Sequence, residues 1–278
     1  MSISVFLAVL AAALLHASWN ALVKSGASKL TSMLILTMVQ AGFGGIVALF
    51  HAFPQAHVWP WLLASGVFHS GYKLFLSFAY EQGDLSRVYP IARGAAPMLV
   101  LALSGFVLSD SLSTFEVVGV IVLGAGILMM ARGVFSNGES RKLVPLALGS
   151  ALMTAGYSIV DGLGARASGD AVMFVAWLFI LDGLLFTPIC LALRGQGVLR
   201  ANKRDWVMGS MAALASYGAY AIAVWAMTQA PIALVSALRE TSILFAVLIG
   251  WLIMGDKMDR GKIIAATLIV IGVGLTRL

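Results

Sequence analysis

The chain has 278 residues, of which 60% are hydrophobic and only 11% are charged, and its mean hydropathy is +0.97. A typical soluble domain carries roughly 25% charged residues, so this composition excludes a soluble globular protein and indicates an integral membrane protein. The net charge of +6 could suggest nucleic-acid binding, but no loop carries a basic domain or an aromatic and basic platform, so we expect no nucleic-acid partner.

Ten apolar segments, each about 20 residues long, follow one another along the chain with only short polar breaks. Because about 20 helical residues cross a bilayer core of about 30 Å, each segment predicts a transmembrane helix. The runs are too long, and alternate too little, for the strands of an outer-membrane barrel, so the predicted fold class is an all-α membrane protein. The predicted spans are 3–23, 30–50, 59–81, 86–108, 113–132, 143–163, 170–193, 206–228, 231–254 and 260–277.

Basic residues lie mostly on one side of the predicted bundle. Thirteen of the 18 lysines and arginines fall in the loops after the odd-numbered spans, whereas only Arg166 and Arg277 fall on the opposite side. Because cytoplasmic loops carry the excess of Lys and Arg, the thirteen-cation side is predicted to be cytoplasmic and both termini to face outward. We therefore expect a multi-pass protein of the bacterial cytoplasmic (inner) membrane.

The two halves of the sequence resemble each other. The offset between matched residues is 138 near the start and 145 or 146 further along, so a single sizeable length change brings the halves into register. The matched pairs are Trp19 with Tyr157, Asn20 with Ser158, Trp61 with Trp206, Tyr72 with Tyr217, Arg93 with Arg239 and Asp110 with Asp256. The chain is therefore predicted to contain two five-helix repeats, residues 1–135 and 136–278, which form one transport unit.

Each repeat has an odd number of helices, so the second must lie inverted relative to the first. The charges of equivalent loops support this inversion, because the loop from Lys24 to Lys29 is basic while its counterpart from Asp161 to Asp170 is net acidic. Inverted repeats around a central cavity are the architecture of many secondary transporters, in which the halves rock to open a mid-membrane site to either face.

Polar residues within the first and third predicted spans require a partner or a polar interior. His16 and Asn20 are spaced i and i+4, so they share one helical stripe, and hydrogen bonds between helices are the alternative explanation for them. In the third span, His69, Tyr72 and Lys73 lie near the centre. A lysine at mid-membrane costs roughly 2.5–3.5 kcal/mol on insertion scales, so we expect Lys73 to line a substrate path.

Two arginines occupy equivalent positions in the two halves. Counting from the loops, Arg93 should lie nearer the cytoplasm and Arg239 nearer the outside, so a substrate anion could pass from one to the other. The alternative is a buried ion pair with Glu240 or Asp182, and the two interpretations are compatible. Pro90 and Pro97 flank Arg93. A proline inside a helix frees a carbonyl and loosens the turn.

Away from their ends, the predicted spans hold three cations, Lys73, Arg93 and Arg239, and two acids, Asp182 and Glu240. This surplus of one positive charge predicts a site for an anionic or acceptor-rich group, and arginine suits carboxylate, phosphate or phosphonate. Glu240, Asp182 or a histidine is the candidate for proton coupling. The predicted substrate-binding residues are His16, Trp19, Asn20, His69, Tyr72, Lys73, Tyr89, Arg93, Tyr157, Tyr217, Tyr220 and Arg239.

Other motifs carry less chemistry. Glycines are frequent in residues 119–126 and 271–274, where small residues predict close helix packing. Cys190 is the only cysteine, and the sequence has no Walker A, GxSxG or HExxH motif. We therefore expect no disulfide, no metal, no cofactor and no ATP-driven transport by this chain alone.

The end of each half is the most characteristic part of the sequence. In "APIALVSALRETSILFAVLIGWLIMGDKMDRGKIIAATLIVIGVGL" (230–275), an apolar helix ends at Gly255-Asp256, and a short charged turn and a glycine-rich helix follow; Ser109-Asp110 repeats the pattern. With ten helices in two repeats, the whole chain resembles the drug/metabolite transporter superfamily, specifically bacterial EamA-type proteins. This resemblance implies that the first, third, fourth, sixth, eighth and ninth helices line a central cavity, supported by the fifth and tenth.

The leading hypothesis is a secondary transporter, not an enzyme, that moves a small organic metabolite by alternating access. The metabolite is expected to be anionic or zwitterionic, such as a carboxylate, amino acid or phosphonate. A membrane-embedded enzyme with His16 or His69 as acid–base group, and a scaffold that transports nothing, are the alternatives. The expected partners are the solute, the lipid bilayer and protons, with the chain as a monomer or homodimer.

Overall fold

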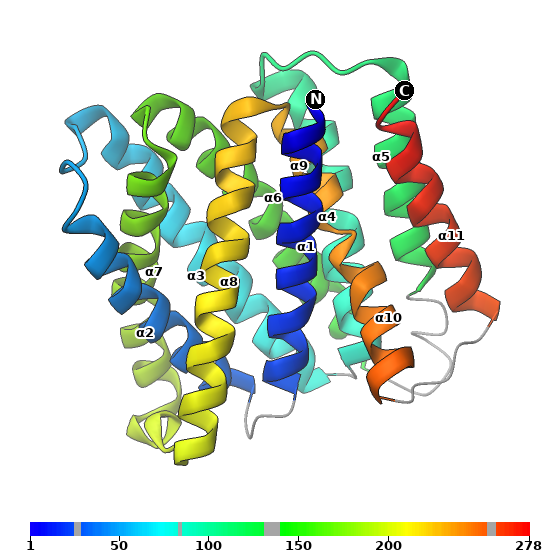
Figure 1. Ribbon diagram of the computed structural model, residues 1–278. Helices are drawn as coiled ribbons and strands as arrows, with labels where there is room; N and C mark the ends of the chain where they lie inside the picture. The colour runs from blue at the N-terminus through cyan, green and yellow to red at the C-terminus, as the bar shows by residue number, and fades with distance from the viewer. Residues whose placement is uncertain (25–28, 83–84, 131–139, 255–259) are drawn as a thin grey trace.

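The computed structural model is a bundle of long helices (Figure 1). It describes residues 1–24, 29–82, 85–130, 140–254 and 260–278, and this part of the chain contains no β-strand. The first half comprises α1 (Ile3–Lys24), α2 (Lys29–Ala48), η1 (Ala56–Val58), α3 (Trp59–Gln82), α4 (Leu85–Val107) and α5 (Thr114–Met129). The second half comprises α6 (Leu143–Ser168), α7 (Ala171–Arg194), η2 (Gln196–Leu199), α8 (Lys203–Gln229), α9 (Ile232–Arg239), α10 (Ser242–Met254) and α11 (Arg260–Leu275).

The helices confirm the ten predicted spans, with α9 and α10 as the two parts of the ninth. By length and composition, seven segments can cross a membrane; they are Ile3–Asn20, Leu30–Ala48, Pro90–Val107, Leu143–Ser168, Ala171–Arg194, Lys203–Gln229 and Ile232–Ile249. The largest departure is α6, which continues to Ser168 instead of ending near residue 163.

Several helix ends are fixed by short-range hydrogen bonds. Ser113 caps α5 and Asn202 caps α8, each in a reciprocal pair with an acidic residue three positions later. At the end of α6, Gly169 adopts a φ of +69°, a left-handed conformation that favours glycine. These caps satisfy backbone groups that the helices themselves leave unpaired.

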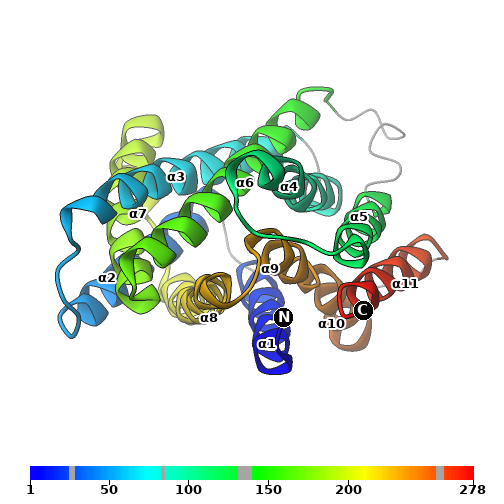
Figure 2. The same ribbon diagram turned by 90° about the horizontal axis from the view of Figure 1, so that it is seen from above.

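The pattern of helix contacts repeats itself between the halves. α3 packs on α6, and the equivalent helix of the second half, α8, packs on α1. Likewise α3 contacts α7 while α8 contacts α2. Two further contacts join a helix to its own counterpart in the other half, α2 with α7 and α5 with α11. Seen from above, these two contacts lie at opposite ends of the bundle (Figure 2). This two-repeat architecture agrees with the internal match in the sequence.

The two repeats run in opposite directions. The N- and C-termini lie at one end of the bundle, which we call the terminal end (Figure 1), and Arg277 Nη1 donates to the carbonyl of Met1 over 2.7 Å. α1 begins at this end, whereas its counterpart α6 finishes there, since Arg166 contacts the start of the ninth span. The inversion follows from the odd number of spans in each half.

The predicted glycine packing surfaces are confirmed between α5 and α11. A Cβ on Gly272 would lie 2.6 Å from the backbone nitrogen of Leu123, and one on Gly119 would lie 2.8 Å from the carbonyl oxygen of Gly272. These distances are too short for any side chain, so the two helix backbones touch. The pair therefore supports the bundle from outside its polar interior.

Candidate functional site

The fourth span meets the ninth through an ion pair between the two halves. Arg93 Nε on α4 lies 2.7 Å from Glu240 Oε2, at the junction of α9 and α10, and both side chains are buried. His16 on α1 lies beside them, with its Nε2 3.3 Å from Arg93 Nη2 and its Nδ1 3.2 Å from Trp19 Nε1. Both neighbours present N–H donors, and a neutral imidazole has only one acceptor nitrogen, so His16 accepts from one of them at a time. Three helices thus converge on Arg93.

The ninth span is interrupted where its charges lie. Between α9 and α10, the N–H of Glu240 bonds to the carbonyl of Ala237, and that of Thr241 to Leu238, three residues back instead of four. The Thr241 hydroxyl also donates to the carbonyl of Leu238. Such tightened turns inside a helix often mark a hinge, and discontinuous helices in transporters lie at substrate sites.

Arg239 lies one residue before Glu240, and its side chain is buried. Its guanidinium carbon lies 4.9 Å from the ring centroid of Tyr220 on α8, a cation–π contact. Its charge also acts through space on Glu240 and His16, but within the described part of the chain it forms no hydrogen bond or ion pair. The guanidinium of Arg239 therefore keeps its donors for another acceptor.

A second polar cluster lies next to Tyr220. Asp161 on α6 is fully buried, and its Oδ2 accepts a hydrogen bond from the Tyr220 hydroxyl and lies 2.9 Å from His69 Nε2 on α3. Tyr157, one turn before Asp161, stacks on the imidazole of His69 with ring centroids 4.2 Å apart. The predicted residues His69, Tyr157 and Tyr220 thus surround an acid that the sequence prediction left out of the site.

The reason for this omission is local. The sequence prediction counted Asp161 with the loop that follows the sixth span, next to the glycines at 162 and 164. In the structure they make room inside a continuous helix: a Cβ on Gly162 would lie 2.5 Å from Ile232, and one on Gly164 would lie 2.5 Å from Phe174. The spacing of four residues between Tyr157 and Asp161 on one helix face was the available signal.

The third cluster surrounds Lys73. Its ammonium donates to Asp182 on α7 and to Thr37 Oγ1 on α2, the latter over 2.6 Å. Lys73 is 1% exposed and Asp182 fully buried. In this structure Lys73 therefore ties α3 to α2 and α7, and its place on a substrate path stays a prediction.

The charge count of the interior also needs correction. Asp161 adds a third buried acid to Asp182 and Glu240, so the three acids balance the three buried cations. The surplus of one positive charge predicted from the sequence is therefore wrong. The distribution of these charges distinguishes the site. Asp182 pairs with Lys73 and Glu240 pairs with Arg93, whereas among the described residues no carboxylate bonds to Arg239 and no lysine or arginine bonds to Asp161.

The remaining predicted residues contribute less. Tyr72 lies edge-on to His69, with centroids 5.8 Å apart, and Tyr217 packs between Phe43 and Phe179. The amide of Asn20 donates to the backbone carbonyl of His16 in its own helix. The side chain of Tyr89 and the predicted repeat partner Asp256 lie outside the described residues.

At the terminal end, a second set of contacts joins the halves. Arg166 at the end of α6 forms a double salt bridge with Asp110, over 2.7 and 3.1 Å, and also donates to the carbonyls of Met227 and Ala230. Asp110 in turn accepts from the N–H of Ile232, the first residue of α9. This cluster fixes the start of the interrupted span to the other half.

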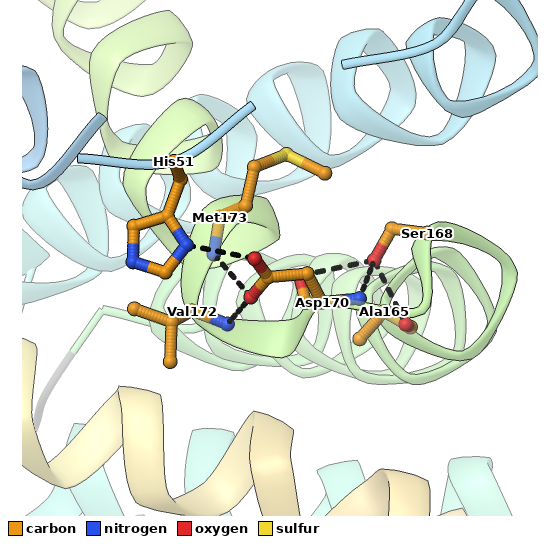
Figure 3. Close-up of polar contacts among 6 residues, drawn as sticks. All are labelled: His51, Ala165, Ser168, Asp170, Val172 and Met173. Atoms are coloured by element: carbon orange, nitrogen blue, oxygen red, sulfur yellow. Dashed lines mark hydrogen bonds and ion pairs between the residues drawn. The ribbon is translucent and has the colours of Figure 1, made fainter. Parts of the chain in front are cut away.

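Figure 3 shows a further contact between the halves at this end. Asp170 caps α7 by accepting from the N–H groups of Val172 and Met173, both over 3.0 Å, and His51 Nδ1 lies 2.7 Å from its other oxygen. Ser168 completes the turn by accepting from the N–H of Asp170. The loop after α2 is thereby held against the corner between α6 and α7.

Comparison with known proteins identifies the family of this two-repeat bundle. The sequence matches the EamA-like transporter family twice, over residues 3–132 and 141–278. The chain belongs to the EamA-like transporter family. An EamA-like protein is a multi-pass membrane protein of the drug/metabolite transporter superfamily, and the family is one of small-molecule transporters.

Solved structures agree on the fold of this EamA-like chain. A crystal structure with 18% sequence identity superposes with a TM-score of 0.77 and covers 99% of this chain and 98% of its own. At this identity the similarity shows the fold alone. No curated protein matches the chain in sequence.

Proposed function

We propose that this protein is a secondary transporter that carries a small zwitterionic or acidic metabolite across the bacterial cytoplasmic membrane by alternating access. Arg239 carries the proposal, because a buried guanidinium that forms no salt bridge with the described residues is costly unless a solute supplies an anionic partner. A carboxylate or phosphonate group fits its planar fork of donors. The solute site lies between the halves, beside Tyr220 and the Arg93–Glu240 pair.

The balance of buried charges refines the class of solute. With three acids and three cations in the interior, a solute without net charge adds the least electrostatic cost. An amino acid or an aminophosphonate meets this condition, and so does an acid that enters together with a proton. The acidic group binds Arg239, and the remainder packs against the aromatic rings around His69.

Alternating access requires contacts between the halves that can break and re-form. The Arg166–Asp110 and His51–Asp170 pairs close the terminal end, and the junction of α9 and α10 supplies a hinge next to the solute site. From the distribution of basic loops, this closed end faces outward and the basic end faces the cytoplasm.

Ligand binding to purified protein tests the proposal. Thermal unfolding is followed with acetate, succinate, glycine, alanine, methylphosphonate, aminomethylphosphonate and tetramethylammonium. We expect acids or zwitterions to stabilise the protein, and Arg239→Gln to weaken their binding by roughly 10- to 100-fold, as for the loss of a charged hydrogen bond worth about 1.5–3 kcal/mol. The exposed Arg200→Gln is the matched control. Stabilisation by tetramethylammonium alone would overturn the assignment.

A further inference from the structure

Asp161 differs from the other two buried acids of the bundle. Asp182 bonds to the ammonium of Lys73, and Glu240 lies against the guanidinium of Arg93, so each has a lysine or arginine as its direct partner. The direct partners of Asp161 are the hydroxyl of Tyr220 and the imidazole of His69. Asp161 is therefore the buried acid whose bonded neighbour can itself gain or lose a proton.

The geometry allows this pair to hold one more or one fewer proton without losing a hydrogen bond. When His69 is neutral, its Nε2–H donates to the Asp161 carboxylate, and the pair carries one negative charge. A proton from water that binds Nδ1 of His69 gives an imidazolium–carboxylate pair without net charge. Nδ1 makes no hydrogen bond to a described residue, and 5% of the His69 side chain is accessible, whereas Asp161 is fully buried. The proton therefore enters through His69.

The charge of the Asp161–His69 pair is only partly neutralised by the groups around it. Oδ1 of Asp161 is buried without a hydrogen-bond partner among the described residues, so its negative charge is incompletely satisfied. The titratable groups in contact with the pair are Tyr72 of α3, Tyr157 of α6 and Tyr220 of α8, and Arg239 of α9 lies behind the ring of Tyr220. The Lys73–Asp182 and Arg93–Glu240 ion pairs lie beyond them.

Tyr220 connects this pair to the solute site. Its hydroxyl donates to Asp161, and the face of its ring lies against the guanidinium of Arg239. An acidic group bound at Arg239 places a second negative charge near the Asp161–His69 pair and so favours the protonated pair. Linkage is reciprocal, so the proton must strengthen binding of the acid to the same extent.

We propose that Asp161 and His69 form a proton-binding site that couples solute transport to the proton gradient, with one proton moving together with each solute molecule. This inference rests on the proposed function and adds the coupling ion to it. It assigns the proton to Asp161 and His69 instead of the sequence candidates Glu240 and Asp182.

Transport by the full-length protein in liposomes tests the coupling. Radiolabelled glycine and aminomethylphosphonate are followed in two assays: exchange at equal pH on both sides, and uptake into vesicles with a more acidic outer solution. With one proton per solute, the wild type should accumulate the transported probe about tenfold for each pH unit, because one unit corresponds to 1.36 kcal/mol. Asp161→Asn and His69→Gln should still exchange the probe at a measurable rate but lose the pH-driven accumulation.

Two features make the result decisive. The glutamine of His69→Gln keeps an N–H donor for Asp161 but cannot be protonated, so it serves if Asp161→Asn fails to fold. Glu116→Gln, which changes an acid outside the interior and can keep the reciprocal cap of α5, should behave as the wild type. Wild-type exchange without pH-driven accumulation, or tenfold accumulation by His69→Gln, would overturn the proton site alone. Exchange of neither probe by the wild type would overturn the proposed function and the coupling together.

Discussion

The guanidinium of Arg93 lies 2.7 Å from the carboxylate of Glu240, so a charge of the first half neutralises one at the break in the ninth span. Glu240 thereby fixes one side of the α9–α10 junction, while the neighbouring Arg239 points its charge to Tyr220. Sequence neighbours thus have separate roles, one in joining the halves and one in offering a cation to a solute.

Glu240→Gln should destabilise the protein strongly, because it leaves the Arg93 charge buried without its carboxylate. Breaking a buried pair costs about 3–5 kcal/mol, whereas replacing both members with apolar residues is often neutral. We therefore expect the double variant Arg93→Met/Glu240→Met to unfold at a higher temperature than Glu240→Gln in the same detergent. A double variant less stable than the single one would contradict this explanation.

Lys73 and Asp182 should prove structural. Lys73→Met alone leaves Asp182 buried and unpaired, so the yield of folded protein is expected to fall sharply. The double variant Lys73→Met/Asp182→Leu should recover folding and keep solute exchange within a few-fold of the wild type. Size-exclusion profiles and exchange in liposomes measure the two effects. A double variant that folds but does not exchange solute would show that the Lys73–Asp182 pair takes part in transport.

The α5–α11 contact predicts a large difference between two glycines of one helix. Gly272→Ala places a methyl group 2.6 Å from a backbone nitrogen, so overpacking should cost about 1–3 kcal/mol. Gly274→Ala meets nothing within 4 Å and should stabilise α11 by up to about 1 kcal/mol, through helix propensity. The unfolding temperatures of the two variants should therefore move in opposite directions. Equal shifts would mean that the backbones do not touch.

The sequence predicts the fold well because its signals are local. Span-length apolar runs bounded by charged residues locate the helices, and matched residues such as Arg93 and Arg239 reveal the repeat. Packing decides what the sequence does not show. The break at Glu240 contains neither proline nor glycine, and the pairing of Lys73 with Asp182 joins helices that are far apart in the chain. Asp161 was missed because it was counted with the loop after the sixth span, whereas α6 continues to Ser168.

Asp170 gives the protein a pH dependence outside the membrane. Partial burial raises the pKa of this carboxyl, but hydrogen bonds from the N–H of Met173, from His51 and from the N–H of Val172 outweigh it, so the pKa lies below its ordinary value. The carboxylate therefore contributes stability above the pKa of an unfolded aspartate, about 3.9, and this contribution is lost as the pH falls through the folded value.

The measurement is the difference in unfolding temperature between the wild type and Asp170→Ala. We expect a constant difference above about pH 5, corresponding to a helix cap worth about 1 kcal/mol, and a shrinking difference below about pH 4. A difference that grows toward acid would show that the pair with His51 does not favour the ionised carboxyl.

The Arg166–Asp110 salt bridge should act as a latch on the terminal end. Asp110→Asn retains an oxygen for the N–H of Ile232 but weakens the bond to Arg166, at a cost of about 1.5 kcal/mol, or about tenfold in the population of open molecules. Ala230→Cys, which is buried beside the latch, should therefore react about tenfold faster with a membrane-impermeant maleimide in the Asp110→Asn background. The native Cys190 is buried and adds little background, and Gly197→Cys, exposed at the other end, should react equally in both backgrounds. Equal labelling of Ala230→Cys in both would mean that this bond stabilises the closed and open forms alike, so that opening depends on other contacts between the halves.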